Sequence, residues 1–514
     1  MKTMRNRRQF LAEVGEGMLV ASVGCAAAVE MGLASARADE APASLAFGPL
    51  EPLVALMQET PANRLLPLLV ERLRAGTELR QLVAAAALAN ARTFAGEDYI
   101  GFHTVMALAP AFHMAGELPE SQRPLPVLKV LYRNSQRIRE FGGRRAERLR
   151  PVRLDTAVQP PPSGAALREA VRHKDMELAE RTFAASARGE AGDAFNHLLW
   201  AVQDNTEVHR VVLAYRSWDL LDLIGREHAH ALLRQSLHYC VMNGGGDGPM
   251  TLLAKLLDQH KLLGRAAGTR RADDAWVERM SKTIFESSPQ NAADAVAASL
   301  AEGMTYEAVG EAISLGANQL ILRDVGRTAR DVQPNKPLGS VHGDSIGVHA
   351  CDSANAWRNM VRACNRRNAV ASLILGAYQV ALDRVNRGGD FLHWEPYPHV
   401  DQLEPASRVA PEHLLAEAES AIRGNDQGRA CALIHRYGEL DRPARPVFDL
   451  LLRYAVSEDG ALHAEKFYRT VSEEFASTRQ PFRWRQLVAL ARVTASEFGR
   501  PAPGYSESRE LLKV

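Results

Sequence analysis

"PANRLLPLLVERLRAG" (61–76) is the stretch that decides the fold class. Its apolar residues recur every three or four positions, which is the period of an amphipathic helix. Thr60 is the expected N-cap, Pro61 the first helical residue and Gly76 the stop. "SSPQNAADAVAASLAEG" (287–303) repeats the hydroxyl-then-proline start and the glycine stop. These signals predict helices of ordinary length joined by short turns.

The same period continues along nearly the whole 514-residue chain, and aromatic residues are only 6%, which is low for a β-rich core. We therefore expect an all-α fold, an array of stacked helix pairs that forms one large domain over residues 39–514. Three connections, at 151–164, 331–340 and 388–411, are too rich in Pro and Gly for regular helix and mark candidate sub-boundaries. The third is also rich in Trp, Tyr and His, and long ordered loops are often functional lids.

The first 38 residues have the composition of a twin-arginine signal peptide. Arg7 and Arg8 precede a mostly apolar stretch that ends in the small-residue pattern Ala36-Arg37-Ala38. The alternatives are a short amphipathic helix and a lipidated Cys25. A twin-arginine signal predicts export of the folded protein to the periplasm or beyond.

The composition also argues against nucleic acid and membrane as partners. The net charge of +1 lacks the basic surplus of a nucleic-acid binder, and no apolar run after the signal is long enough to span a membrane. We expect a small-molecule substrate, and the sequence leaves the oligomeric state open. No CxxC pair supports a zinc ribbon or c-type haem, and the pairing of the remaining cysteines stays open. These are Cys240, Cys351, Cys364 and Cys431.

A short motif recurs along the chain. "DYIGFH" (98–103) and "DSIGVH" (344–349) share Asp-x-Ile-Gly-apolar-His, and "DNTEVH" (204–209) and "EDGALH" (458–463) keep an acid five residues before the histidine. This spacing predicts diverged helical repeats of roughly 105 to 140 residues. The equivalent histidines are His103, His209, His349 and His463. The tyrosines 29 to 30 residues after the first three are Tyr132, Tyr239 and Tyr378.

The motif has a structural and a functional interpretation. In the first, the aspartates cap helices, Gly101 and Gly347 permit a tight turn and the histidines pack. In the second, Asp and His bind a divalent metal, since two histidines with carboxylates suit non-haem iron. A transition metal such as iron is then the cofactor. The predicted metal ligands are Asp98, His103, Asp344 and His349, and the predicted catalytic residues are His103, His209 and His349. No residues for a separate organic cofactor are predicted, because P-loop and GxGxxG motifs do not occur.

Two longer stretches carry a family resemblance. "HTVMALAPAFHMAGELPESQRPLPVLKVLY" (103–132) and "HACDSANAWRNMVRACNRRNAVASLILGAY" (349–378) resemble helix pairs of the questin oxidase-like proteins, which are all-helical and carry histidines that open successive inner helices. The resemblance covers much of residues 60–500. It implies an oxidoreductase of Baeyer–Villiger type acting on an aromatic or polyketide-like substrate, with His103 and His349 at the family's histidine positions.

Two hypotheses of function follow. The first is an exported, metal-dependent oxidoreductase with an inward-facing Asp/His site that acts on a small organic, aromatic substrate. The second is a non-catalytic α-helical repeat protein that binds or scaffolds a partner in the cell envelope. An enzyme should bring the motif residues together, whereas a scaffold should leave each one at its own helix start.

Overall fold

The computed structural model describes residues 33–34, 44–153, 162–334, 336–343 and 345–514. In these residues α-helices, labelled α2 to α24, make up nearly all of the regular structure. The rest is five short 3-10 helices and two strands, β1 (Leu33–Ala34) and β2 (Val152–Arg153), which pair in parallel. The predicted all-α fold is therefore confirmed.

The helices follow one another in four groups. The first comprises α2 (Glu51–Glu59), α3 (Ala62–Arg74), α4 (Leu79–Phe94), α5 (Tyr99–Glu117) and α6 (Pro124–Phe141). The second comprises α7 (Gly164–Arg172), α8 (Met176–Ser186), α9 (Ala191–Val202), α10 (Val208–Ile224) and α11 (Ala229–Asn243). The third comprises α12 (Asp247–Gln259), α13 (Asp274–Glu286), α14 (Pro289–Ala301), α15 (Tyr306–Arg323), α16 (Ile346–Ala363) and α17 (Arg366–Arg387). The fourth comprises α18 (Val400–Ser407), α19 (Leu414–Arg423), α20 (Gln427–Glu439), α21 (Arg445–Ser457), α22 (His463–Ser477), α23 (Gln480–Glu497) and α24 (Tyr505–Leu512). The 3-10 helices are η1 (Gly48–Leu50), η2 (Glu120–Gln122), η3 (Gly143–Ala146), η4 (Arg226–His228) and η5 (Leu262–Gly264).

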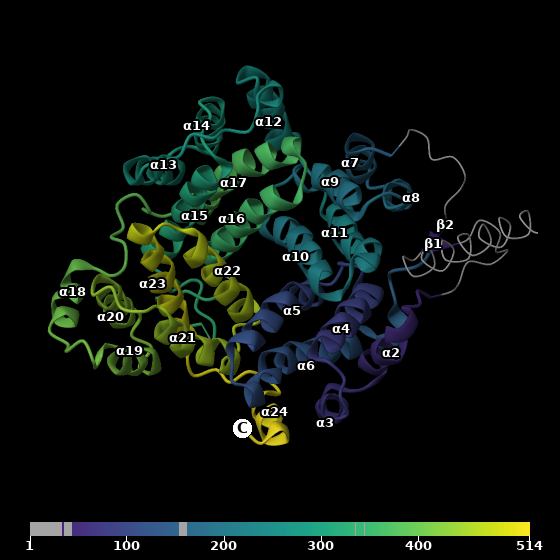
Figure 1. Ribbon diagram of the computed structural model, residues 1–514, viewed down its shortest axis with the longest axis horizontal. Helices are drawn as coiled ribbons and strands as arrows, with labels where there is room; N and C mark the ends of the chain where they lie inside the picture. Colours follow the sequence, from purple (N-terminus) through teal and green to yellow (C-terminus); the bar gives the residue numbers. More distant parts are fainter. Residues whose placement is uncertain (1–32, 35–43, 154–161, 335, 344) are drawn as a thin grey trace, which may run out of the picture.

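Four helices, one from each group, occupy the centre of the molecule (Figure 1). α5 contacts α10, α10 contacts α16, α16 contacts α22, and α22 contacts α5, so the four form a closed ring. Each central helix also packs against the helix before it and the helix after it, as α4 and α6 do around α5. The same three-helix arrangement recurs as α9–α11, α15–α17 and α21–α23. The predicted stacking of helix pairs is thus found four times around the ring.

The core and the chain ends hold this ring together. The central helices are buried on most of their circumference because other helices surround them, and Trp357 on α16 is fully buried. The alanines of α4 are also buried, which lets α5 and α11 approach closely. At the other end of the chain, α24 packs against α3 and α6, so the last helix returns to the first group (Figure 1).

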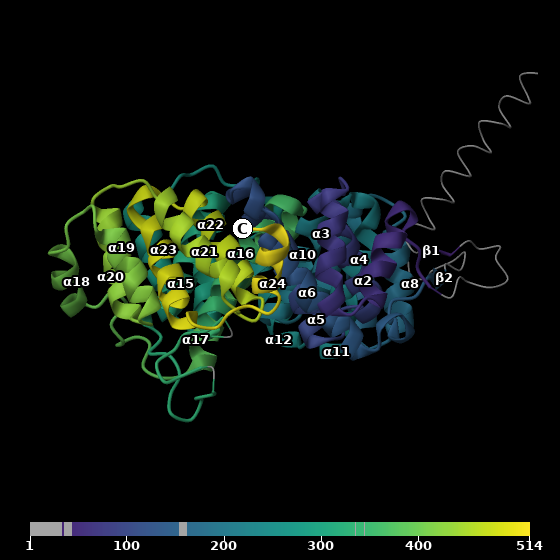
Figure 2. The same ribbon diagram turned by 90° about the horizontal axis from the view of Figure 1, so that it is seen from below.

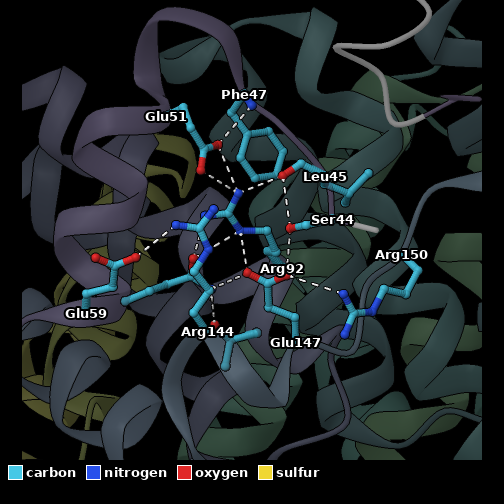
Figure 3. Close-up of polar contacts among 11 residues, drawn as sticks. Ser44, Leu45, Phe47, Glu51, Glu59, Arg92, Arg144, Glu147 and Arg150 are labelled. Atoms are coloured by element: carbon cyan, nitrogen blue, oxygen red, sulfur yellow. Dashed lines mark hydrogen bonds and ion pairs between the residues drawn. The ribbon is translucent and has the colours of Figure 1, made fainter. Parts of the chain in front are cut away.

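A buried ionic network fixes the segment that precedes α2 (Figure 3). The guanidinium of Arg92 on α4 is fully buried and lies 2.8 Å from Glu51 and 3.1 Å from Glu147. It also donates to the carbonyl oxygen of Leu45 at 2.7 Å. Because a buried charge is tolerated only when it is paired, this network ties residues 45–51 to the body of the fold.

Several predicted boundaries need correction. Pro61 is the N-cap of α3 rather than its first residue, because Thr60 still ends α2. Ser288 does cap α14 through its side chain, as predicted. The segment 388–411 is not wholly irregular, because α18 forms within it; the side chain of Gln402 accepts the backbone N–H of His399 and closes the first turn.

Two parts of the chain bear on export and on the site. The predicted signal peptide, residues 1–38, lies outside the described residues except for Leu33 and Ala34 of β1. None of the helices that the structure describes has an apolar stretch that could cross a bilayer. The described part of the connection from α15 to α16, residues 324–334 and 336–343, projects from one face of the molecule (Figure 2).

Candidate functional site

The four repeated histidines meet at the centre of the ring of helices. His103 lies in α5, His209 in α10, His349 in α16 and His463 in α22, each within the first five residues of its helix. Because these helices pack side by side in a ring, their first turns lie together. The structure therefore brings the three predicted catalytic residues to one place and adds His463.

The rings form a closed cycle of neighbours. The ring centroid of His103 is 4.8 Å from that of His209 and 5.0 Å from that of His463. The centroid of His349 is 5.5 Å from that of His209 and 5.2 Å from that of His463. The Nε2 atoms of His349 and His463 are 3.2 Å apart. We call these four residues the histidine cluster.

Neighbouring groups fix which ring nitrogen is available. Nδ1 of His103 donates to the carbonyl oxygen of Tyr99 at 2.6 Å, and Nδ1 of His463 donates to that of Ala461 at 3.1 Å. Nδ1 of His209 lies 2.5 Å from Glu207. The Nε2 atoms of His103 and His209 are buried and have no hydrogen-bond partner among the described residues. Metal-binding histidines have this arrangement, in which the other ring N–H is held by a carbonyl or carboxylate.

The spacing of the rings can be compared with that around a bound ion. Imidazole ligands at about 2.0–2.1 Å from a metal have ring centres about 4.6–5.4 Å apart, and the spacings in the histidine cluster lie in or beside this range. However, no group of three or more His, Cys, Asp or Glu side chains in the described part of the chain is arranged to hold a metal ion. Neighbouring rings thus have the spacing of ligands, but as placed their nitrogen atoms do not surround a common point.

The electrostatic surroundings favour neutral imidazole, which is the form that binds metal. Burial lowers the pKa of His103 and of His463 well below the usual range, and the charge of Lys466 and the neighbouring histidines lower it further. Lys466 lies on α22 and is itself buried, and burial lowers its pKa to about 8. The first turns of four helices add partial positive charge at the same place.

A carboxylate that the sequence interpretation missed orients His209. Glu207 accepts from Nδ1 of His209 and, at 2.8 Å, from the hydroxyl of Tyr239. Burial alone would raise the pKa of Glu207, but the hydrogen bond and charge of His209, with the other hydrogen bonds, lower it to about 2. The recurrence of Tyr239 after His209 in the repeat pattern was the available signal for this contact.

The predicted acidic ligand Asp98 has other partners. Asp98 caps α5 through the backbone N–H of Gly101 at 2.7 Å and pairs with Arg137, whose Nε and Nη2 lie 2.9 and 2.5 Å from its oxygens. The ion pair and these hydrogen bonds lower the pKa of Asp98 although burial opposes them. Asp344 lies outside the described residues.

The motif glycines are needed for close approach rather than for a tight turn. Gly101 and Gly347 lie inside α5 and α16, and neither has a positive φ. A Cβ on Gly347 would lie 2.8 Å from the backbone nitrogen of Ile321 on α15, and one on Gly101 would lie 2.6 Å from the ring of Phe94 on α4. Because glycine has no side chain, the helix turns that carry His103 and His349 can lie directly against the neighbouring helices.

Two clefts lead from the surface to the histidine cluster. One, of about 370 Å³, is lined by His349, Asn386 and Arg387. The other, of about 400 Å³, is lined by His463 and Arg500. His342, in the connection between α15 and α16, lines both clefts, so this connection separates them.

An aromatic surface covers another side of the histidine cluster. The ring of Tyr99 lies 4.5 Å from that of His103 and 5.5 Å from that of His209. The ring of Phe102 lies 4.9 Å from His103, 5.2 Å from His209 and 5.2 Å from Tyr239. Because Tyr99 is 57% exposed, this aromatic surface reaches solvent.

Comparisons with protein-family models, curated proteins and solved structures find no match for this chain. The resemblance to the questin oxidase-like proteins therefore stays a prediction, and the functional argument depends on the geometry of the histidine cluster.

Proposed function

We propose that this chain is a metal-dependent oxidoreductase whose active site is the histidine cluster. The observation that carries the proposal is the meeting of four imidazoles from four repeats, two of which have a buried Nε2 atom without a partner among the described residues. A buried polar atom left without a partner costs about 1–3 kcal/mol. A bound ion would supply the missing partner to both atoms at once.

The donor set favours a first-row transition metal. Imidazole nitrogen suits iron, copper, zinc and nickel, and a redox-active ion such as iron would supply the electron-transfer chemistry of an oxidoreductase. The ligands in this proposal are His103, His209, His349 and His463, without Asp98, whose oxygens are engaged by Gly101 and Arg137. Glu207 and the carbonyl oxygens of Tyr99 and Ala461 hold the rings in the tautomer with Nε2 available.

Residues around the histidine cluster would bind and orient a small organic substrate. The two clefts, of about 370 and 400 Å³, are within the range of small-molecule sites. Tyr99 and Phe102 present an aromatic surface beside the rings of His103 and His209, which favours a flat, aromatic substrate. The resemblance to the questin oxidase-like proteins supports the same substrate class.

The proposal includes export by the twin-arginine route, based on Arg7 and Arg8 and the Ala36-Arg37-Ala38 pattern. This route carries folded proteins, so a metal would enter the histidine cluster before export to the periplasm or beyond. The scaffold hypothesis expected each histidine to remain at its own helix start. The convergence of four histidines argues against that hypothesis.

Cobalt(II) spectroscopy tests the proposal, because the visible bands of bound Co²⁺ report nitrogen ligation. We expect the metal-free protein to bind one Co²⁺ per chain, and a His103→Ala/His349→Ala variant to lose those bands. A matched control, His173→Ala/His393→Ala, removes two exposed histidines and should bind as the wild type does. Equal Co²⁺ spectra in the cluster variant and the wild type would refute the proposed site.

A further inference from the structure

A separate, larger cleft lies beside α13, α15, α20 and α23. Its volume is about 630 Å³. Residues from the segment between α17 and α18, among them Leu392 and Tyr397, form one wall. Figure 1 shows this segment passing between α13 and α20. None of the residues that line the cleft belongs to the histidine cluster, so it is a second site rather than an entrance to the first.

Arg323, at the end of α15, is the unusual charged group in this cleft. Its Nε donates to the side-chain oxygen of Gln319 at 3.0 Å and its Nη1 to the carbonyl oxygen of Trp394 at 2.7 Å, and both acceptors are neutral. No carboxylate in the described part of the chain lies within ion-pair distance of it, although Glu278 and Glu286 also line the cleft and the charge of Glu286 acts on Arg323. Arg485 lines the same cleft but lies 3.0 Å from Glu278.

The guanidinium of Arg323 therefore has no carboxylate hydrogen-bonded to it. Burial lowers the pKa of Arg323 and the charge of Glu286 partly offsets this, yet a guanidinium stays protonated in proteins. A partly buried cation that hydrogen-bonds only to neutral groups gains from an anionic partner in direct contact. An anionic group in the cleft would accept charge-assisted hydrogen bonds from Arg323. The planar guanidinium can donate two parallel hydrogen bonds to the oxygens of a carboxylate or sulfonate.

The rest of the cleft offers apolar surface beside this charge. The guanidinium carbon of Arg323 lies 5.6 Å from the ring centroid of Phe285. Tyr397 and Leu392 lie along the same cleft, and Leu392 is 45% exposed. A ligand with an acidic group beside an apolar part would therefore contact both the charged and the apolar residues of the cleft.

We infer that this cleft binds a small organic acid, with the acidic group on Arg323 and the apolar part of the ligand against Leu392 and Tyr397. The inference is independent of the function proposed for the histidine cluster. It assigns a role to the aromatic, proline-rich segment 388–411, part of which forms a wall of the cleft.

Two fluorescent probes test the inference. 8-Anilino-1-naphthalenesulfonate carries both an acidic group and an aromatic body, and N-phenyl-1-naphthylamine has the same rings without the acid. We expect Arg323→Gln to weaken binding of the sulfonate at least about tenfold and to leave binding of the neutral amine unchanged. Leu392→Ala should weaken binding of both probes, because Leu392 lines the cleft and is 45% exposed.

Matched variants keep the test decisive. Arg485→Gln removes a paired arginine from the same cleft and should change affinity for the sulfonate less than about twofold. Arg323→Lys keeps the charge and should retain more affinity than Arg323→Gln. Equal affinity for the sulfonate in the wild type and Arg323→Gln, or equal losses in Arg323→Gln and Arg485→Gln, would overturn the inference.

Discussion

Replacement of Lys129 by methionine is expected to lower the free energy of unfolding by about 3–5 kcal/mol. Lys129 on α6 lies 2.7 Å from Glu465 on α22, and the two side chains are 2% and 0% exposed. The ammonium also donates to the carbonyl oxygens of Ala455 and Glu458 at 2.9 and 2.7 Å. Without it, the buried carboxylate of Glu465 loses its ion-pair partner, and removing one member of a buried ion pair is strongly destabilising.

Thermal unfolding of the metal-free protein measures this cost. With an unfolding entropy of about 2 cal/mol/K per residue, a chain of this size loses about 1 °C of Tm per kcal/mol, so Lys129→Met should melt about 3–5 °C lower. The Lys129→Met/Glu465→Met variant removes the uncompensated charge and should recover at least half of the loss. A Lys129→Met melting point within 1 °C of wild type, or a double variant that shows the sum of the two single losses, would refute the reasoning.

Three further perturbations address the histidine cluster and its helices. As pH falls below 6.5, the usual pKa of histidine, the metal-free protein should lose up to about 1.4 kcal/mol per pH unit for each of His103 and His463. The reason is that burial lowers the pKa of both histidines, so that only the unfolded chain takes up protons in this pH range. Urea titrations at pH values from 7 to 5 measure the loss. A free energy of unfolding that stays constant over this range contradicts the prediction. Gly347→Ala should lower the free energy of unfolding by about 1–3 kcal/mol, because the added Cβ would contact α15. Gly116→Ala on α5, where the added Cβ meets no neighbour within 4 Å, should not lower it. Equal urea midpoints for the two variants would disprove this prediction. Asp98→Ala should lose about 1 kcal/mol from the helix cap, more than Asp98→Asn, and thermal melting that ranks them the other way would contradict the cap assignment.

The sequence predicts the features of this fold that depend on local chemistry. Helical period, the Ser288-Pro289 start and the recurrence of Asp-x-Ile-Gly-apolar-His are all readable within a few residues, and they lead to an all-α repeat fold. The equivalence of His103, His209, His349 and His463 is likewise a matter of spacing. Because repeats place equivalent turns in equivalent positions, that spacing predicted that His103, His209 and His349 would meet, and the structure adds His463 to them.

The remaining features depend on contacts between distant parts of the chain. Asp98 has the residue type of a metal ligand, but Arg137, 39 positions later, engages its carboxylate. The role of Gly347 depends on Ile321 of another helix, which no local pattern reveals. The pairing of Arg323 with two neutral acceptors, Gln319 and Trp394, becomes visible only when its neighbours in space are known.

Whether the histidine cluster is a metal site is decided by measuring the metal content of the protein by plasma mass spectrometry. The protein is exported by its native host and purified without a histidine tag. If the histidine cluster binds metal, the protein should contain close to one transition-metal ion per chain. This ion should be lost in His103→Ala/His349→Ala and kept in the exposed-site control His173→Ala/His393→Ala. A metal-free wild-type protein, or a metal content that is equal in the cluster variant and the control, would contradict the claim that the histidine cluster is a metal site.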